Sequence, residues 1–591
     1  MRTHVSDFAR ATLIAACLGA CLAAASSAAP APDAALAGGP GAFKGMGAPA
    51  HPKVPVAWNR YYDHAGITDI CRRLAAAHPG LCRLESIGKS YAGRDLWALT
   101  ITDFSAGDPA RRSGYYIDGN IHANELQGSE VALYTAWYLL ENFGVVEGIT
   151  RLVRERTFYI VPTINPDGRD DFLHRANSPN SPRSGVVPRD DDGDGQPDED
   201  QAADLDGDGN ITQMRKADPN GRWKTSPDDP RLMVTCEPDE KGQWTLLGEE
   251  GTDQDRDGSV AEDPTGYYDP NRDWGWNWAP RYVQQGAERY PFSLPESRAV
   301  RDFVRAHPNI AGAQTYHNAM GAILKGPGER SDAFQPEDVA TFDLVGRRGE
   351  EVLPGYRYLT VWSGLYTVYG GELDWFYGAR GVLCFSNELW TAWNLFRKDA
   401  GGGFFGAQPD LYRFDRLLLF GEGVVPWRAY RHPQFGDVEI GGLKKMWTRM
   451  PPTFLLEEEC HRNMAFTLFH AWTLPLVHVD SLRVTALPGG VRQVDVRVVN
   501  ERPMATHTAQ DRVNRITPPD AFTLTVPGGK VLAGFAVDNE YLGNLAEQKE
   551  HPERLVVPGI AGNGVLKLRW LVSGDGAPTV TVESVRATVR E

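Results

Sequence analysis

The sequence predicts an α/β protein, in which helices flank a mixed central sheet, followed by a C-terminal all-β sandwich. Two observations lead to this fold class. Buried apolar strands alternate with helical segments over most of the chain, and from residue 476 short alternating runs are separated by turn residues. A chain of 591 residues that is 42% hydrophobic has enough apolar surface to bury a large core and an accessory domain.

The first 28 residues have the features of an export signal. Arg2 and Arg10 precede an apolar stretch, and small residues with a Pro-rich segment follow it. We therefore expect an exported protein, periplasmic or secreted, with lipid anchoring at Cys21 as an alternative. Residues 29–55 form a Gly/Pro/Ala-rich linker. No later stretch has the roughly 20 apolar residues of a membrane-spanning helix.

Residues 56–430 carry the strand and helix alternation of the main domain. Each predicted strand is a short apolar run, and each predicted helix has apolar residues three and four apart. In chain order we predict a helix over 67–78, paired strands over 81–103, a strand over 114–122, a helix over 126–143, and strands over 156–165, 310–317 and 381–390. In α/β sheets, functional side chains gather at the carboxyl ends of the strands.

Two further segments complete the chain. We expect a helical connector over 431–475 and the β-sandwich over 476–591. The sandwich strands are predicted over 481–487, 492–499, 521–526, 565–572 and 579–585. We expect this domain to tune stability or surface binding rather than catalysis.

An acidic insertion, residues 189–263, interrupts the alternation of the main domain. It holds 23 acidic and 8 basic residues, which accounts for nearly all of the net charge of −16. Such a charge disfavours binding to nucleic acid or to an anionic membrane. Three runs have aspartates on alternate positions followed by glycine, as calcium-binding loops do. Their aspartates are Asp190, Asp192, Asp194, Asp204, Asp206, Asp208, Asp253, Asp255 and Asp257.

None of these runs completes an EF-hand loop. The twelfth positions, where that loop has a glutamate, hold Gln201, Arg215 and Pro264. We therefore expect irregular calcium sites, and a solvated acidic loop is the alternative.

Beyond the export signal the chain has five cysteines and no CxxC pair. In an oxidising compartment, Cys71 and Cys82 are the pair best spaced for a disulfide bridge. Five buried free thiols are the alternative.

Four side chains at strand ends form a set suited to metal-assisted amide hydrolysis. His122 and Glu125 are three residues apart where a buried strand passes into a helix, and His317 ends a second strand. A catalytic zinc site needs three protein ligands and an open position. Glu388, which ends a third strand, supplies a separate carboxylate as the base.

These segments, in their residues and in their order along the chain, resemble those of the zinc metallocarboxypeptidase family of pancreatic carboxypeptidase type. The resemblance spans Trp58 to Tyr430. The matching segments are Ile87-Gly-Lys-Ser-Tyr-Ala-Gly-Arg94, His122-x-x-Glu125, Asn165-Pro-Asp-Gly168, Asn271-Arg272, Tyr316-His317, Tyr366 before the glycine pair 370–371, and Glu388. The distance of 22 residues from Tyr366 to Glu388 agrees with the family's spacing of its mobile tyrosine and catalytic glutamate.

The resemblance implies a zinc carboxypeptidase-like fold and a role for each matching catalytic residue. His122, Glu125 and His317 would bind Zn²⁺. Glu388 would take a proton from the attacking water and pass it to the leaving amine. An arginine that polarises the scissile carbonyl is also implied. Arg215 is the match that we choose for it, and Arg175 is the alternative.

The resemblance also implies residues that hold the substrate. Asn271 and Arg272 would bind the terminal carboxylate of a peptide, and Tyr366 would close over the bound residue. Leu373 stands at the position that lines the specificity pocket. An apolar residue there disfavours a strict preference for basic side chains, because a buried cation would lack a partner.

Two positions depart from the family pattern. The pancreatic enzymes have an arginine where this chain has Asn124, between the zinc ligands, and a serine where it has Asn318. The auxiliary substrate contact of that arginine is therefore not expected from Asn124.

The sequence thus predicts an exported, calcium-dependent zinc carboxypeptidase that acts on peptides or proteins with a free C-terminus. Two alternatives remain open. One is a zinc amidase that acts on cell-wall peptides or small acyl amino acids, and the other is a catalytically silent, calcium-ordered binding protein.

Overall fold

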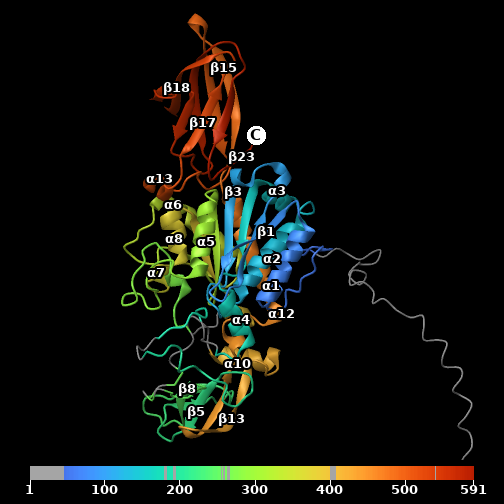
Figure 1. Cartoon of the computed structure of the whole chain (residues 1–591), viewed down its shortest axis with the longest axis vertical. Coiled ribbons are helices and arrows are strands. Elements are labelled where there is room, and N and C mark those ends of the chain that lie inside the picture. Colours follow the sequence, from blue (N-terminus) through green and yellow to red (C-terminus); the bar gives the residue numbers. More distant parts are fainter. Residues whose placement is uncertain are drawn as a thin grey trace, which may run out of the picture. The chain divides into compact units, whose positions relative to one another are not determined.

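A mixed sheet of eight strands, here called the central sheet, forms the middle of the main domain (Figure 1). The computed structural model describes residues 46–178, 183–190, 195–254, 256, 258, 260–261, 266–398, 408–539 and 541–590. The expected export signal and Cys21 lie outside these residues. The chain divides into two units, Met1–Lys53 and Val54–Glu591, and every element below belongs to the second.

The central sheet brings several carboxyl strand ends to one edge. Its order is β1 (Cys82–Lys89), β2 (Asp95–Ile101), β4 (Arg156–Val161), β3 (Ser113–Gly119), β9 (Ile310–Asn318), β12 (Leu383–Leu389), β10 (Ala322–Lys325) and β11 (Arg357–Thr360). Strands β4, β3, β9 and β12 pair in parallel. Parallel strands in such sheets are buried on both faces, and every residue of β3, β4 and β9 is buried.

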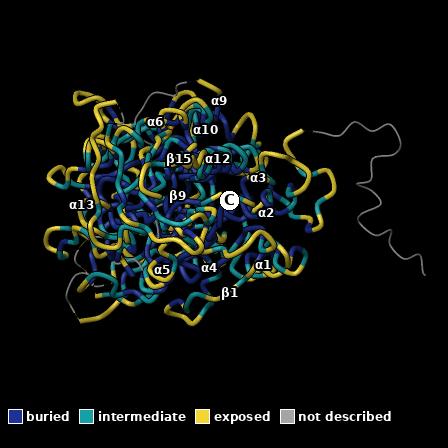
Figure 2. The backbone as a smooth tube through the Cα atoms, turned by 90° about the horizontal axis from the view of Figure 1, so that it is seen from above, coloured by how far each residue is buried: buried dark blue, intermediate teal, exposed yellow. Residues whose placement is uncertain are grey.

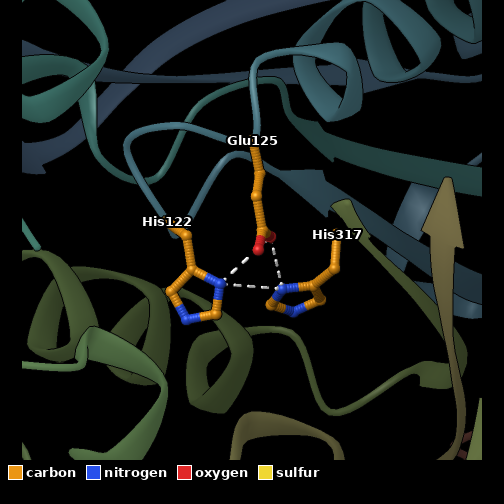
Figure 3. A group of neighbouring side chains, drawn as sticks. All are labelled: His122, Glu125 and His317. Atoms are coloured by element: carbon orange, nitrogen blue, oxygen red, sulfur yellow. Dashed lines mark hydrogen bonds and ion pairs between the residues drawn. The ribbon is translucent and has the colours of Figure 1, made fainter. Parts of the chain in front are cut away.

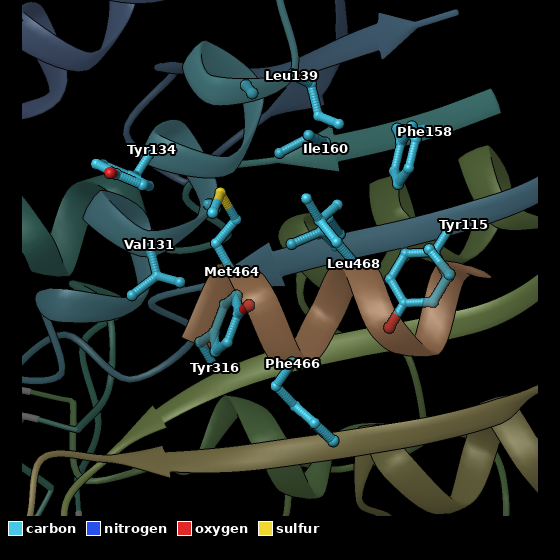
Figure 4. Close-up of a cluster of buried hydrophobic side chains, with 14 of the residues drawn as sticks. Tyr115, Val131, Tyr134, Leu139, Phe158, Ile160, Tyr316, Met464, Phe466 and Leu468 are labelled. Atoms are coloured by element: carbon cyan, nitrogen blue, oxygen red, sulfur yellow. The ribbon is translucent and has the colours of Figure 1, made fainter. Parts of the chain in front are cut away.

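Successive side chains of these strands pack into two different hydrophobic cores, because strand side chains alternate between the two faces of the sheet. Tyr115 and Ile117 of β3 belong to the core on the α2 and α12 face, whereas Tyr116 belongs to the core on the α5 and α8 face. Figure 4 shows Met464, Phe466 and Leu468 of α12 packed in the first of these cores. Figure 2 shows the buried backbone around β9.

Helices cover both faces and fill the connections. They are α1 (His64–Ala77), α2 (Gln127–Asn142), α3 (Glu147–Glu155), α4 (Pro166–His174), α5 (Pro295–Ala306), α6 (Pro336–Val352), α7 (Val361–Gly364), α8 (Glu372–Arg380), α9 (Trp393–Phe396), α10 (Gln408–Phe414), α11 (Lys445–Thr448), α12 (Thr453–Thr473) and α13 (Ala509–Asn514). Helix α2 is buried almost all round because it lies between the central sheet and α12. The predicted α/β class is confirmed.

Much of the acidic insertion folds into a second sheet, here called the accessory sheet. Its order is β13 (Val424–His432), β14 (Gly436–Leu443), β5 (Gln213–Ala217), β8 (Trp244–Glu249), β6 (Trp223–Thr225) and β7 (Met233–Thr235). Strand β14 lies in the connector for which only helix was predicted. It pairs with β5 through Glu439 and Arg215, so the insertion and the connector complete one sheet.

The C-terminal region is a β-sandwich, as predicted. One sheet has the order β19 (Asn544–Gln548), β18 (Lys530–Asn539), β21 (Val565–Ser573), β16 (Val491–Asn500), β15 (Leu476–Ala486) and β23 (Thr588–Arg590). The other has the order β20 (Arg554–Val557), β17 (Asp520–Thr525) and β22 (Thr579–Glu583). Phe522, Trp570 and Val496 are among the residues of the core between them.

Buried arginines join the sandwich to the main domain. Arg156 donates to the backbone oxygens of Ala471 and Leu474 at the end of α12. Arg586 donates to the backbone oxygen of Gly381 and forms an ion pair of 3.1 Å with Asp511. Arg156 also donates to the hydroxyl of Thr588 in β23. Buried charges are costly unless they are paired or hydrogen-bonded, so these contacts stabilise the junction.

The described cysteines are all free and buried, so Cys71 and Cys82 form no bridge and the alternative of five free thiols holds. Among the described helices, none combines the length and the apolar character needed to cross a membrane.

Candidate active site

Two histidines and one glutamate meet at the carboxyl edge of the central sheet (Figure 3). The Nδ1 atoms of His122 and His317 are 3.2 Å apart, and each lies close to Oε2 of Glu125, at 3.0 and 2.9 Å. All three side chains are buried. We call His122, Glu125 and His317 the ligand cluster.

The fold places these residues through strand pairing and one tight loop. His317 lies near the end of β9, while His122 and Glu125 follow β3, the neighbouring parallel strand. The Asn120 side chain holds the loop by donating to the backbone oxygens of His122 and Glu125. Asn120 has φ of 57°, a conformation that asparagine tolerates better than most residues.

Charged partners orient the ligand cluster. Nε2 of His122 lies 2.9 Å from Asp269, which leaves Nδ1 facing Glu125. Burial alone would raise the pKa of Asp269, but Arg272, His122 and Arg183 together hold it well below its usual value. Likewise, the two imidazoles hold the pKa of Glu125 well below its usual value against the opposite effect of burial.

Glu388 lies beside the cluster on the next strand. It pairs with His317 in the register of β12 and β9, and it lines the same cavity as His122 and His317. Removal from water and the neighbouring Glu125 carboxylate raise the pKa of Glu388 to about 7. Its carboxylate is therefore easily protonated and deprotonated near neutral pH.

Two arginines that sequence reasoning missed reach the cluster. Nη2 of Arg183 lies 3.1 Å from Nε2 of His122 and 3.3 Å from Asp269. Nη1 of Arg449 lies 3.8 Å from Oε1 of Glu125. Arg183 lies in a loop whose sequence has no hydrophobic periodicity, and Arg449 lies beyond the span of the family resemblance. The sequence near either residue therefore did not mark it as functional.

Arg215, chosen from the sequence as the carbonyl-polarising residue, lies elsewhere. It is on β5 of the accessory sheet, where Glu439 accepts from its guanidinium and the rings of Trp244 and Trp427 flank it. The alternative, Arg175, is largely exposed and pairs with Asp171. Arg183 lines the cavity that contains Glu388, whereas neither Arg215 nor Arg175 is among the residues that line it.

The residues expected to hold the substrate line one cavity of about 60 Å³ together with His122 and His317. Asn271 lies 3.3 Å from His317, and Nε of the buried Arg272 has no hydrogen-bond partner among the described residues. Tyr366 is 52% exposed at the opening, whereas Leu373 is 9% exposed. The structure therefore brings together all four of the residues expected to bind substrate.

The apolar side of this cavity has a defined composition. Leu324, Val361, Val368 and Leu373 form one buried cluster that lines it. Two carboxyl groups adjoin it on α8. Burial, and then the nearby Asp118, raise the pKa of Glu372 well above its usual value, and burial raises the pKa of Asp374 to about 7.

The calcium-like runs are only partly described. Asp192, Asp194, Asp255 and Asp257 lie outside the described residues. Asp204, Asp206 and Asp208 lie close enough to share one ion, and backbone N–H groups of Gly207 and Gly209 donate to Asp204. Calcium binding there, and at Asp190 and Asp253, stays a prediction.

Comparisons with known proteins identify family models that match most of the chain. The model described as zinc carboxypeptidase matches residues 67–225 and 246–405, just over half of the chain. A model described as a domain of unknown function matches residues 476–591, the β-sandwich.

Individual relatives match shorter stretches. Carboxypeptidase D of Mus musculus is 40% identical over 98 residues, which cover 16% of this chain and 7% of that protein. Inactive metallocarboxypeptidase ECM14 of Ajellomyces capsulatus is 32% identical over 139 residues, which cover 24% of this chain and 23% of that protein. The chain thus spans less than a quarter of the length of the curated relatives it matches.

Solved structures are similar at low sequence identity. Thrombin activatable fibrinolysis inhibitor has a TM-score of 0.41 at 16% identity, and the match covers 70% of this chain and 77% of that one. Carboxypeptidase A from Helicoverpa armigera has a TM-score of 0.39 at 18% identity, and the match covers 57% of this chain and 66% of that one.

Proposed function

Because the chain belongs to the zinc carboxypeptidase family, we propose that it removes residues from the free C-terminus of peptides. One observation carries this proposal. A single cavity is lined by the two histidines of the ligand cluster, by a separate glutamate and by an arginine whose buried Nε has no hydrogen-bond partner among the described residues. The first two features suit amide hydrolysis, and the third suits a terminal carboxylate.

The ligand cluster fits zinc. Two ligands about 2.1 Å from a tetrahedral ion lie about 3.4 Å apart, and the three donor atoms here are separated by 2.9 to 3.2 Å. The contact of His122 with Asp269 is the carboxylate–histidine arrangement that orients zinc-binding imidazoles. When bound, zinc would polarise the scissile carbonyl and lower the pKa of water to about 7.

The protein's own groups would handle the proton and the oxyanion. Glu388 takes a proton from the attacking water and returns it to the leaving amine. The Arg183 guanidinium, held by Asp269 at 3.3 Å, donates to the carbonyl oxygen and stabilises the negative charge that develops there. This role was expected for Arg215 and passes to Arg183 because Arg183 lies in the cavity.

Binding groups would fix the C-terminal residue. Arg272 and Asn271 hold the terminal carboxylate, where a guanidinium can donate two parallel hydrogen bonds. The ring of Tyr366, exposed at the opening, covers the bound residue and excludes water.

We also propose that the released residue is apolar or aromatic. The cavity wall is aliphatic, and the raised pKa values of Glu372 and Asp374 favour their neutral forms. A basic side chain would therefore lose its hydration without gaining a full opposite charge.

The test compares peptides with free and amidated C-termini, with and without a chelator. We expect stepwise release of C-terminal apolar residues from free peptides only, abolished by chelation and restored by Zn²⁺. Hydrolysis of cell-wall muropeptides alone would instead support a zinc amidase. No hydrolysis of any substrate by the zinc-loaded protein would support a silent binding protein and overturn the proposal.

A further inference from the structure

An arginine from outside the family-matched region faces the ligand cluster. Arg449 lies between α11 and α12, well beyond residue 405, where the family match ends. Its guanidinium donates to the backbone oxygen of Asn318, and its Nη1 is 3.8 Å from Oε1 of Glu125. The last distance is longer than a hydrogen bond but short enough for an ion pair with the glutamate.

Asn318 holds Arg449 in this place. The Asn318 side chain donates to the backbone oxygen of Arg449 and to Gln127, while the Arg449 guanidinium donates to the backbone oxygen of Asn318. Each of the two side chains therefore donates a hydrogen bond to the other residue's backbone at the end of β9. By contrast, Asn124 between the ligands is fully buried and is not among the residues that line the cavity.

Arg449 also lines a second cavity, here called the aromatic cavity. Its volume is about 320 Å³, and its wall includes Trp223, Leu246, Tyr412 and Trp427. These residues come from the accessory sheet and α10. A largely apolar cavity of this size with a few polar groups is the usual form of a binding site for a small molecule or side chain.

We propose that Arg449 and the aromatic cavity bind the part of the peptide upstream of the scissile bond. The guanidinium would donate to a backbone carbonyl of the retained chain, and the cavity would take a large apolar or aromatic side chain. Two points argue for this occupant. In the proposed function the released residue fills the other cavity, which Arg272 and Tyr366 line, so the retained chain needs a separate site. Arg449 both lines the aromatic cavity and lies 3.8 Å from Glu125 of the ligand cluster.

This inference rests on the proposed function but is tested without turnover. In the zinc-loaded Glu388→Gln variant, calorimetry measures the binding of acetyl-Ala-Leu and of acetylated tetrapeptides that end in Ala-Leu. One tetrapeptide has only glycine upstream, and the others have phenylalanine at one upstream position each. We expect one phenylalanine peptide to bind about tenfold more tightly than the glycine peptide.

Two substitutions in the same background separate the parts of the site. Arg449→Gln should weaken all tetrapeptides at least tenfold and change acetyl-Ala-Leu less than twofold. Leu246→Trp, which fills part of the aromatic cavity, should remove only the advantage of phenylalanine. Arg462→Gln is the matched control, because Arg462 pairs with Glu458 on α12 away from both cavities. It should change nothing.

The inference is overturned if no phenylalanine peptide is favoured, or if Arg449→Gln weakens the short and long peptides equally or not at all. If Arg449→Gln does not fold by circular dichroism, Leu246→Trp decides the outcome. Preferential binding without hydrolysis by the unmodified protein would reject the proposed function but keep the inference. Hydrolysis without upstream preference would reject the inference alone.

Discussion

Glu388 lies directly beside His317 across the parallel pairing of β12 and β9. The separate glutamate and a member of the ligand cluster are thus fixed by the same backbone hydrogen bonds rather than by a flexible loop. A site built on paired strands keeps its geometry when one side chain is replaced. A substitution at Glu388 should therefore change the catalytic rate without disturbing the fold.

Glu388→Gln should lower kcat/KM for C-terminal hydrolysis by about 10³-fold, because the amide cannot accept the proton of the attacking water. The zinc content, measured by elemental analysis, should be unchanged, since Glu388 is not a member of the ligand cluster. Glu351→Gln, at an exposed position, is the control and should retain full activity. Retention of more than a tenth of the activity by Glu388→Gln would exclude this glutamate as the base.

Arg183→Gln and Arg215→Gln should have different effects on hydrolysis. With acetyl-Ala-Leu, which is too short to reach the aromatic cavity, Arg183→Gln should lower kcat by about 10²-fold through the loss of an oxyanion donor. Arg215→Gln should leave kcat within twofold and lower the melting temperature, because Arg215 joins Glu439 and two tryptophan rings. The opposite pattern would return the catalytic role to Arg215.

Leu373→Asp should shift the preference from apolar toward basic C-terminal residues. A carboxylate at the aliphatic wall would pair with a lysine or arginine side chain and impose a desolvation cost when an apolar residue binds. The ratio of kcat/KM for C-terminal leucine to that for C-terminal lysine should fall at least tenfold. Leu373→Asn, which adds polarity without charge, should lower it much less. Equal effects of both variants would show that charge at this position does not decide specificity.

His507 should make stability depend on pH. Burial alone would lower the pKa of His507, but the hydrogen bonds that its ring nitrogens donate to the Asp511 and Asp520 carboxylates raise it to about 9. Because the folded value exceeds the unfolded value of about 6.5, the stabilisation is fully present below pH 6.5 and is lost as the pH rises through 9. His507→Gln should therefore cost ~1–3 kcal/mol at pH 6 and much less at pH 9.5.

Thermal unfolding across this pH range measures the effect. His551→Gln is the control, because the His551 side chain is 85% exposed, and its unfolding curve should follow that of the parent at each pH. A constant difference between His507→Gln and the parent from pH 6 to 9.5 would show that His507 is not charged in the folded protein.

The fold class and the metal-ligand candidates could be predicted because both follow from local pattern. His122, Glu125, His317 and Glu388 each end an apolar run, and parallel pairing brings such ends together. The tyrosine and the asparagine–arginine pair were predicted through the resemblance of their segments to the zinc metallocarboxypeptidase family.

The remaining features depend on contacts between distant segments. The strand Trp223–Thr225 has only three residues, too few for a visible alternation. Strand β14 was assigned to a helical connector because its partner β5 lies more than 200 residues earlier. Arg183 and Arg449 reach the ligand cluster because of the paths that a loop and the connector take in the fold. The sequence around a single arginine does not indicate such a path.

The pairing of β5 with β14 also limits how this protein could have changed in evolution. The insertion ends at an unpaired strand edge without β14, and β14 has no neighbour on that side without the insertion. Because exposed edges invite aggregation, loss of either segment alone would be harmful. We therefore expect related proteins to have both the insertion and β14 or neither. Sequences with only one of the two should be rare.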